Sequence, residues 1–207
     1  MNLQQKFNNQ LKNFLNQKKQ ALEKKDKSFK KSIDEKAKKI IEEINKKDFM
    51  FTTSSCSGRA ILFKEKGKKQ RGAIIKAWHD KIKIDELVNQ LENLKNTNIN
   101  QKIYFKFEPP IYHIICFNSD IAARVVKIAR QIGFKKSGFY YGKRNFPLVE
   151  IRGSEEICMP IFYKKILVGK EYLSLLVKET NKKFKQVWKK QKKFLKEIKR
   201  LKIELNF

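Results

Sequence analysis

The sequence lacks the features that mark a disulfide-rich, zinc-binding or membrane-spanning protein. Its three cysteines, Cys56, Cys116 and Cys158, are odd in number and far apart, and no two have the C-x-x-C spacing. Neither a disulfide framework nor a metal site is indicated, and a reducing cytoplasm is the expected compartment. No apolar run approaches the roughly 20 residues that span a bilayer, and the N-terminus lacks the apolar core of a signal peptide.

Acidic residues are also scarce, with 21 against 49 basic residues and a formal net charge of +28. A field of this sign favours polyanionic partners. Only seven of the basic residues are arginine, while Lys, Asn, Ile and Phe are plentiful, which is the usage of an AT-rich genome. Such a bias also enriches Glu, so it does not account for the positive excess. Nucleic acid is the favoured partner, with an anionic membrane surface and compositional drift as alternatives.

The apolar residues are numerous enough for a folded core, at 41% of the chain with sixteen Phe. Apolar spacings of three and four over residues 5–45 predict two helices around a polar break at 24–28, and a capping-box spacing of Ser32 and Glu35 begins the second near Ile33. Short β-prone runs predict strands at residues 49–53, 60–63, 73–78, 103–107, 112–117, 148–151 and 158–162.

Three further helices are predicted downstream. One begins at Asp85 and ends in the Asn-rich stretch 96–100, and another covers residues 119–132, with Ser119 as its N-cap and Gly133 as its stop. The last has a 3/4 apolar spacing from Leu173 to Leu205 and would be about 50 Å long. Its other faces are dense in Lys, either as a solvated surface or as a rail for phosphates.

The order of helix, strands, helix, strands and helix predicts an α+β fold, with a mixed β-sheet, flanking helices and a long C-terminal helix. A Rossmann-like methyltransferase fold is not expected, since no G-x-G-x-x-G follows the first strand. We expect one domain over residues 1–207, made of an N-terminal helical extension (1–25), a core (26–172) and a basic C-terminal helix (173–207).

Residues 52–59, TTSSCSGR, place hydroxyls, a thiol, a glycine and an arginine between two predicted strands. A loop of this composition can direct backbone N–H groups and short donors toward a carboxylate or phosphate. A plain Ser-rich turn is the alternative interpretation.

Several motifs follow one another in order along the chain. They are Asp26-Lys27-Ser28, TTSSCSGR, Lys106-Phe107-Glu108-Pro109 with Ile111-Tyr112-His113-Ile114, Gly133-Phe134 with Ser137-Gly138, and Val149-Glu150-Ile151-Arg152-Gly153-Ser154 with Met159-Pro160. The series resembles the wybutosine-synthesis tRNA methyltransferase family, from about Asp26 to Tyr172. That family methylates N4 of the tricyclic base made from guanosine 37 of phenylalanine tRNA. The resemblance implies a transferase that uses S-adenosyl-L-methionine.

The resemblance also suggests which residues form the site. The residues expected to bind the cofactor are Ser54, Ser55, Cys56, Gly58 and Arg59. Those expected to bind substrate or RNA are Lys27, Ser28, Lys106, Glu108, His113 and Arg152, to which composition adds the aromatic-basic cluster of Tyr140, Tyr141, Lys143 and Arg144. The chain departs from many members at Ile74, where they have Trp, and from some at Glu155, where they have His.

Methyl transfer to a ring nitrogen that bears a proton benefits from a nearby base. Asp26 and His79 are the catalytic candidates, although either could be an ordinary structural group, and His113 is expected to have a supporting role in the core. Cys56 is not expected to act as a covalent nucleophile, because the acceptor nitrogen attacks the methyl group directly. Arg59 and Arg152 suit anion binding, or an ion pair with a carboxylate such as Glu108.

Two other functions are compatible with these features. The chain could be a non-catalytic RNA-binding module with the same fold, which would have no reason to recognise S-adenosyl-L-methionine. It could also be a methyltransferase that acts on a different RNA.

Overall fold

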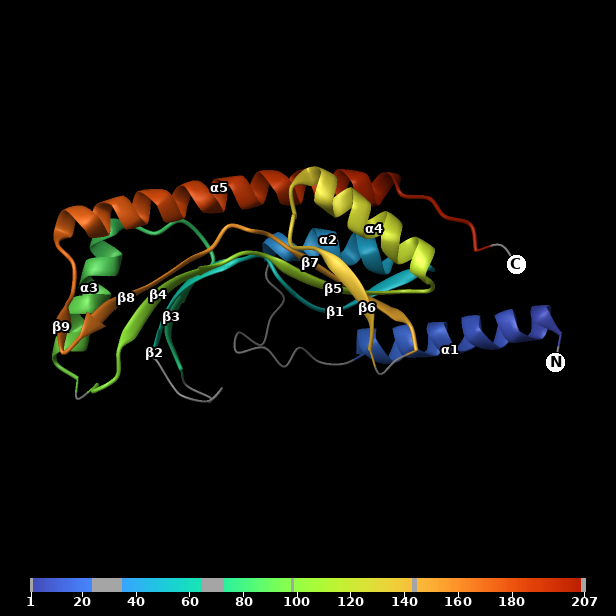
Figure 1. The fold of residues 1–207 in the computed structure, drawn as a ribbon, viewed down its shortest axis with the longest axis horizontal. Helices are drawn as coiled ribbons and strands as arrows, with labels where there is room; N and C mark the ends of the chain where they lie inside the picture. Colours follow the sequence, from blue (N-terminus) through green and yellow to red (C-terminus); the bar gives the residue numbers. More distant parts are fainter. Residues whose placement is uncertain (1, 24–34, 65–72, 98, 143–144, 206–207) are drawn as a thin grey trace. The chain divides into compact units, whose positions relative to one another are not determined.

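The structure is a computed structural model that describes residues 2–23, 35–64, 73–97, 99–142 and 145–205 (Figure 1). These residues form five helices and nine strands in two compact units. Unit 1 comprises Met1–Ser57, Pro110–Ser154 and Lys189–Phe207, and unit 2 comprises Gly58–Pro109 and Glu155–Trp188. The single domain predicted over residues 1–207 stays a prediction beside this division.

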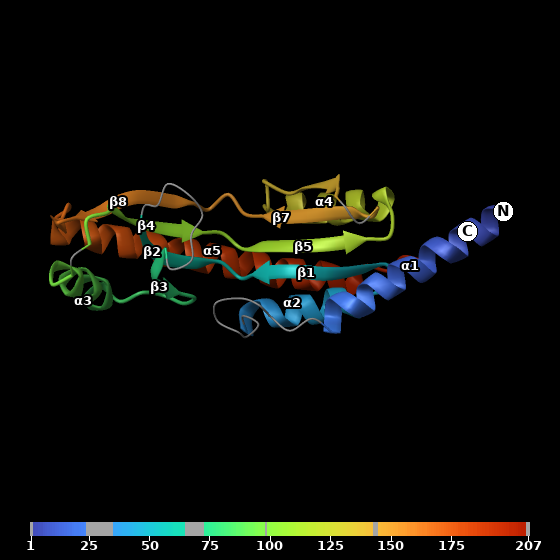
Figure 2. The ribbon, with the colours of Figure 1, turned by 90° about the horizontal axis from the view of Figure 1, so that it is seen from below.

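Unit 1 contains a four-stranded antiparallel sheet with the order β1-β5-β7-β6. Its strands are β1 (Met50–Cys56), β5 (Ile111–Cys116), β6 (Gly138–Tyr141) and β7 (Pro147–Arg152). The helices α2 (Glu35–Asn45) and α4 (Ser119–Ile132) and the end of α5 (Lys170–Arg200) lie on one side of these strands, and α1 (Leu3–Glu23) lies on the other (Figure 1). Seen from below, β1, β5 and β7 lie in front of α5 (Figure 2).

Alternation along the strands gives each face of this sheet a separate apolar layer. Tyr112, Ile114, Val149 and Ile151 are fully buried and form the layer on the side of α4 and α5. On the other face α1 inserts Phe14 into a group of aromatic rings, with centroids 5.3 Å from Phe51, 5.5 Å from Phe117 and 5.1 Å from Phe146. Helix α1 therefore covers one end of that face.

Unit 2 contains a five-stranded antiparallel sheet with the order β3-β2-β4-β8-β9. Its strands are β2 (Arg59–Lys64), β3 (Ile74–Trp78), β4 (Ile103–Glu108), β8 (Ile157–Tyr163) and β9 (Lys165–Ile166). Helix α3 (Ile84–Lys95) and the first part of α5 supply Leu87, Leu91 and Phe184 to a core that includes Phe105 and Phe107.

Helix α5 is amphipathic along its whole length because buried residues recur every three or four positions. Those that are buried include Leu173, Val177, Thr180, Phe184, Val187, Gln191, Phe194 and Ile198. In the described part of the chain, no helix combines the length and the apolar character that crossing a membrane requires.

The α+β class and the long C-terminal helix predicted from the sequence are confirmed, as is the position of every predicted strand to within a few residues. The prediction of a single mixed sheet is wrong, because the described strands form two sheets in which all pairs are antiparallel. Helix α5 ends at Arg200, so Leu205 lies beyond it. The sequence did not predict β6 or β9 as strands, and the proposed start of the second helix at Ser32 and Ile33 lies outside the described residues.

Helix α4 has a well-defined cap at each end. Its N-cap is Asn118, not Ser119 as predicted, because the Asn118 side chain accepts a hydrogen bond of 3.0 Å from the Ile121 N–H. At the other end Gly133 has a φ of 109°, a left-handed conformation that glycine adopts without strain, and its N–H donates to the last carbonyls of the helix. The predicted stop at Gly133 is confirmed.

We expect Asn118→Ala to lower the free energy of unfolding by about 1 kcal/mol, because the Ile121 N–H loses its acceptor. Ser119→Ala is the matched control and should change it by less than about 0.5 kcal/mol. Urea denaturation followed by circular dichroism measures both, and equal effects in the two variants would contradict the assignment of the cap.

Candidate functional site

The predicted Ser-rich loop is mostly strand. Strand β1 continues through Ser54, Ser55 and Cys56, so the connection to β2 is reduced to Ser57 and Gly58. Its pairing with β5 changes register between Thr52 and Ser54, where Thr53 is the additional residue of a β-bulge. The prediction of a loop over these serines is therefore wrong, because the partner strand supplies the hydrogen bonds that extend β1.

The bulge places Ser54 opposite His113, which lies opposite Glu150 on β7. Side chains of one such row share a face of the sheet. Ser54 Oγ lies 2.7 Å from His113 Nδ1, and His113 Nε2 lies 3.1 Å from Glu150 Oε2. The imidazole is 23% exposed and the carboxylate 33%, while Ser54 is exposed. These three residues, which we call the polar row, form a continuous hydrogen-bonded chain.

A second row lies two residues further along the same face and contains Cys56, Ile111 and Arg152. The backbone of Arg152 is held by Ser137, whose buried hydroxyl accepts from the Arg152 N–H at 3.1 Å and donates to the Phe134 carbonyl at 2.7 Å. The motif around Gly133 and Ser137 thus supports the end of β7.

The opposite face joins the end of β1 to α5. Gln191 Nε2 donates to Tyr112 Oη at 2.8 Å and to the Ser57 carbonyl at 3.2 Å, and all three residues are buried. Ser55 lies on this face, opposite Tyr112, and its buried Oγ has no hydrogen-bond partner in the described chain. Successive residues of β1 therefore project from opposite faces of the sheet. The expected role of Ser55 in binding the cofactor stays a prediction.

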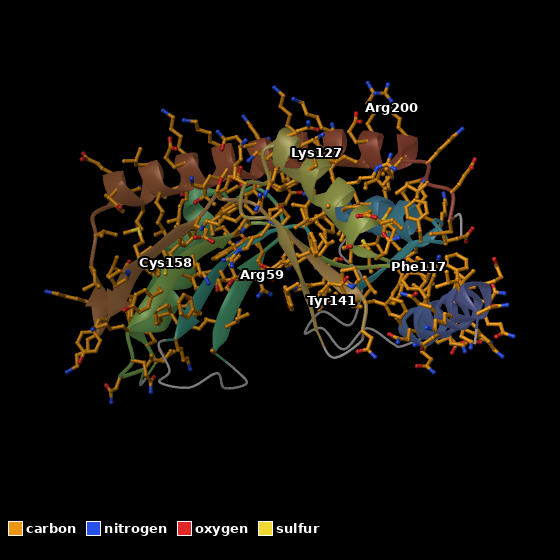
Figure 3. The ribbon with its side chains drawn as sticks, turned by 45° about the vertical axis from the view of Figure 1, so that its right-hand side comes forward. Arg59, Phe117, Lys127, Tyr141, Cys158 and Arg200 are labelled. Carbon is orange, nitrogen blue, oxygen red and sulfur yellow. The ribbon has the colours of Figure 1, made fainter. Side chains whose placement is uncertain are left out.

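Unit 2 contains a separate charged cluster on β2 and β4. Arg59 Nε donates to Glu108 Oε2 at 2.8 Å, and Lys106 Nζ donates to Glu108 Oε1 at 3.0 Å. Burial by itself raises the pKa of Glu108, but the hydrogen bonds and positive charges of Arg59 and Lys106 outweigh it, so this pKa lies below its ordinary value of 4.5. The ion pair between Arg59 and Glu108, one of the two interpretations of Arg59, is present in the structure, and Figure 3 labels Arg59.

The remaining predicted residues are distributed along the chain. His79 follows the end of β3 in unit 2 and is half-buried, while Tyr140 is exposed on β6 in unit 1. Asp26, Lys27, Ser28, Lys143 and Arg144 lie outside the described residues.

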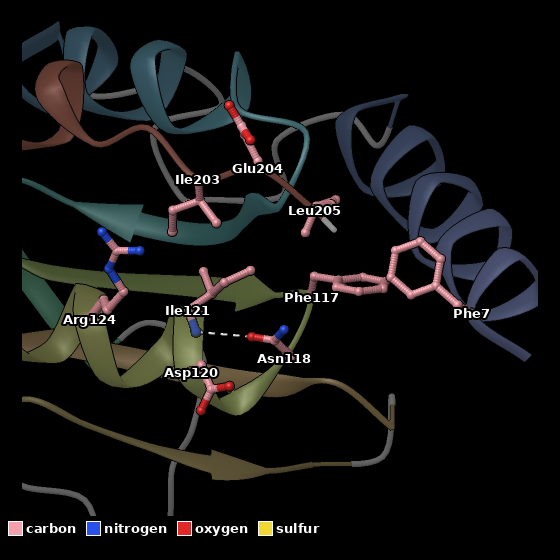
Figure 4. A pocket seen from close by; sticks show the side chains of 9 residues that line it. All are labelled: Phe7, Phe117, Asn118, Asp120, Ile121, Arg124, Ile203, Glu204 and Leu205. Atoms are coloured by element: carbon pink, nitrogen blue, oxygen red, sulfur yellow. Dashed lines mark hydrogen bonds between the residues drawn. The ribbon is translucent and has the colours of Figure 1, made fainter. Parts of the chain in front are cut away.

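A pocket of about 210 Å³ lies elsewhere in unit 1, between α1, the start of α4 and the C-terminal segment (Figure 4). It is lined by Phe7, Phe117, Asn118, Asp120, Ile121, Arg124, Ile203, Glu204 and Leu205. None of the residues predicted for the methyl-transfer site lines this pocket, so the pocket gives no support to a role in methyl transfer.

Glu150 lies within one of the motifs of the sequence, but no role was predicted for it. Its position two residues before Arg152 on a strand was the available signal, because residues i and i+2 share a face. Gln191 also had no assigned role, although a Gln in the apolar series of α5 indicates a buried polar contact.

The depressed pKa of Glu108 predicts an acid-sensitive contribution to stability. The contribution is complete above the ordinary value of 4.5 and is lost as the pH falls through the lower folded-state pKa. At about pH 7 we expect Glu108→Gln to reduce the free energy of unfolding by about 1 kcal/mol, and at about pH 3 this difference should shrink.

Urea unfolding at the two pH values measures the effect. Glu92→Gln, which alters an exposed ion pair with Lys95 on α3, is the control and should be nearly neutral at both. A difference for Glu108→Gln that stays constant with pH would contradict the role of the carboxylate charge.

Comparison with known proteins identifies the family of this chain. A family model described as Methyltransferase TYW3 matches residues 10–200, beyond both ends of the segment 26–172 that carries the motifs. The tRNA wybutosine-synthesizing protein 3 homolog of Danio rerio is 32% identical over 169 residues, covering 79% of this chain and 65% of that protein. This chain thus matches less than two thirds of the length of that relative.

An archaeal relative is matched over more of its length. The tRNA(Phe) 7-((3-amino-3-carboxypropyl)-4-demethylwyosine(37)-N(4))-methyltransferase 1 of Pyrococcus furiosus is 30% identical over 152 residues, covering 72% of this chain and 76% of that protein. The solved structure of the PH1069 protein from Pyrococcus horikoshii superposes with a TM-score of 0.80 at 26% identity, covering 91% of this chain and 97% of that one. From its sequence and its fold, the chain belongs to the TYW3 methyltransferase family.

Proposed function

We propose that this protein transfers a methyl group from S-adenosyl-L-methionine to N4 of a tricyclic guanosine-37 derivative, of the 4-demethylwyosine type, in phenylalanine tRNA. The observation that carries the proposal is the family match over residues 10–200, which includes both the polar row and the charged cluster of unit 2. The name of the relative from Pyrococcus furiosus describes a methyltransferase that acts on N4 of a 4-demethylwyosine derivative at position 37 of tRNA(Phe), which supports the acceptor in this proposal. Among the described residues Cys56, Cys116 and Cys158 are not joined in disulfides, which suits activity in the cytoplasm.

The side chains of unit 2 fit one end of the proposed methyl donor, which carries a carboxylate and an ammonium group. Among described residues Arg59 uses only Nε in its bond to Glu108, so its Nη groups suit the carboxylate. Glu108 supplies a negative charge for the ammonium group, and Lys106 keeps that charge in place. The donor supplies an electrophilic methyl group when bound. The cofactor role of Arg59 is retained here, with Lys106 and Glu108 added to it.

The residues of unit 1 suit the acceptor base. Ser54 is exposed and polar, Cys56 and Arg152 lie on the same face, and Arg152 can hold a phosphate beside the modified nucleotide. Methyl transfer between a sulfonium and a nitrogen depends mainly on orientation, so residues that fix the position of the base can provide much of the acceleration. Strand pairing makes these positions rigid.

The test uses labelled S-adenosyl-L-methionine and phenylalanine tRNA that carries the unmethylated tricyclic precursor. Nucleoside mass analysis should find one methyl group added by the wild type. We expect Ser54→Ala and Arg59→Ala to reduce transfer at least about 100-fold while the circular dichroism spectrum is retained.

Cys158→Ser, an exposed change on β8, is the control and should keep full activity. Full activity in both Ser54→Ala and Arg59→Ala would exclude the proposed sites. Tight tRNA binding without methyl transfer by the wild type would favour a non-catalytic RNA-binding module.

Helix α5 has a surface that suits the RNA backbone. Seven lysines, which we call the lysine stripe, are exposed at alternating spacings of four and three, namely Lys178, Lys182, Lys185, Lys189, Lys192, Lys196 and Lys199. Successive members are about 5 Å apart along the helix axis. Each of the first six lies two positions before a buried residue, which corresponds to the opposite side of the helix. Basic side chains project outward from α5 as far as Arg200 (Figure 3).

Because the lysine stripe extends along the helix, it suits a row of phosphates better than a single compact anion. Lys182 has an acidic neighbour in the described part of the chain, because its Nζ lies 3.8 Å from a carboxylate oxygen of Glu179. In unit 1 the stripe faces away from the sheet, because Gln191 and Phe194 occupy the inner side of α5. RNA phosphates bound there are therefore different from those beside the modified base.

We expect the combined Lys182, Lys185, Lys189 and Lys192→Gln variant to weaken tRNA binding and to reduce its dependence on salt. Each lost phosphate contact should lower the slope of log affinity against log salt by about 0.7–0.9, or about 3 for four contacts. Fluorescence anisotropy over a salt series measures the slope.

The matched control changes four exposed lysines of α1 and α2, Lys6, Lys12, Lys19 and Lys39→Gln, and so alters the net charge equally. Its slope should change by less than about 1. Equal changes in the two variants would mean that net charge alone, and not the stripe, attracts the RNA.

A further inference from the structure

We propose that Ser54, His113 and Glu150 form a proton relay that removes the proton from the acceptor nitrogen, with Glu150 as a positioning residue. This inference rests on the proposed methyl transfer and deepens it. It also changes the roles expected from the sequence, because it gives the base function to His113 and not to Asp26 or His79.

The direction of the hydrogen bonds follows from the chemistry of Glu150. An ionised carboxylate only accepts hydrogen bonds, so the 3.1 Å contact requires that His113 Nε2 carries the hydrogen. In the neutral imidazole Nδ1 is then unprotonated and accepts the hydroxyl hydrogen of Ser54 at 2.7 Å. The lone pairs of Ser54 Oγ remain directed away from the imidazole, where an N–H of a bound base can donate to them.

The row is built by backbone pairing and not by mobile side chains. Each member is on a different strand of one sheet, and β5 carries His113 between its two partners. The neighbours of His113 on β5, Tyr112 and Ile114, are buried on the other face and fix the orientation of that strand. Exposure rises from the partly buried His113 to Ser54, so Ser54 is the member that a substrate meets first.

The proton and electron balance of the step can be followed atom by atom. The lone pair of the acceptor nitrogen forms the new N–C bond to the methyl group, and the electron pair of the broken S–C bond stays on sulfur. The proton of that nitrogen passes to Ser54 Oγ as the serine hydroxyl hydrogen passes to His113 Nδ1. The imidazolium that results is stabilised by the negative charge of Glu150, and its proton is later released to water.

The chain contains only two histidines, His79 and His113, so their ring nitrogens can be observed directly. We expect ¹⁵N NMR of the wild type, with His113→Asn for assignment, to show hydrogen on Nε2 and none on Nδ1 of neutral His113. Glu150→Gln should keep this tautomer, because its amide oxygen still accepts the N–H, whereas Glu150→Ala should yield a mixture. Ser54→Ala should keep it as well.

Methyl transfer separates the relay from a purely structural role. Glu150→Gln removes the charge that stabilises the imidazolium, so kcat should fall about 100-fold with KM nearly unchanged. Glu42→Gln, an exposed change on α2 of unit 1, is the matched control and should keep the wild-type kcat.

A wild-type kcat in Glu150→Gln, or hydrogen on Nδ1 of neutral His113, would overturn the relay and leave the proposed function intact. Failure of the wild type to methylate the precursor tRNA would overturn the proposed function and, with it, the purpose assigned to the relay.

Discussion

The register between β1 and β5 is the constraint on which the candidate site depends. Side chains alternate between the faces of a sheet, so one additional residue at Thr53 exchanges the faces of everything that follows it on β1. Ser54 and Cys56 thereby join the face of His113 and Arg152, and Ser55 joins the face of Tyr112. Without that bulge Thr53 would pair with His113, and Ser54 would turn toward α5.

The helices and the strand positions could be predicted from the sequence because their signals are local. The apolar spacing of α5 and the glycine that ends α4 require no knowledge of distant residues. The site could be predicted only in part. Ser54 and His113 were recognised through motifs, but their contact depends on a pairing across 59 positions, and Glu150 lies 37 positions further. The number of sheets and the direction of their strands likewise depend on long-range partners, and the serines of β1 have too little strand propensity to reveal the strand.

The carboxylates of Glu108 and Glu150 differ in how their neighbours hold them. Glu108 is fixed by two cations, and its negative charge is maintained against the effect of burial. Glu150 instead shares a hydrogen bond with a single imidazole and is more exposed. The first arrangement suits a constant charge that holds a ligand, and the second suits a carboxylate whose partner gains and loses a proton during a reaction.

The bond from Gln191 to the Ser57 carbonyl joins positions that are 134 residues apart. During synthesis, β1 therefore leaves the ribosome long before the helix that completes its surroundings. Unit 1 is assembled from three separate segments, the last of which begins at Lys189. A nascent chain that stops short of this helix lacks the group that holds the end of β1, so unit 1 can acquire its final architecture only after Gln191 has been synthesised.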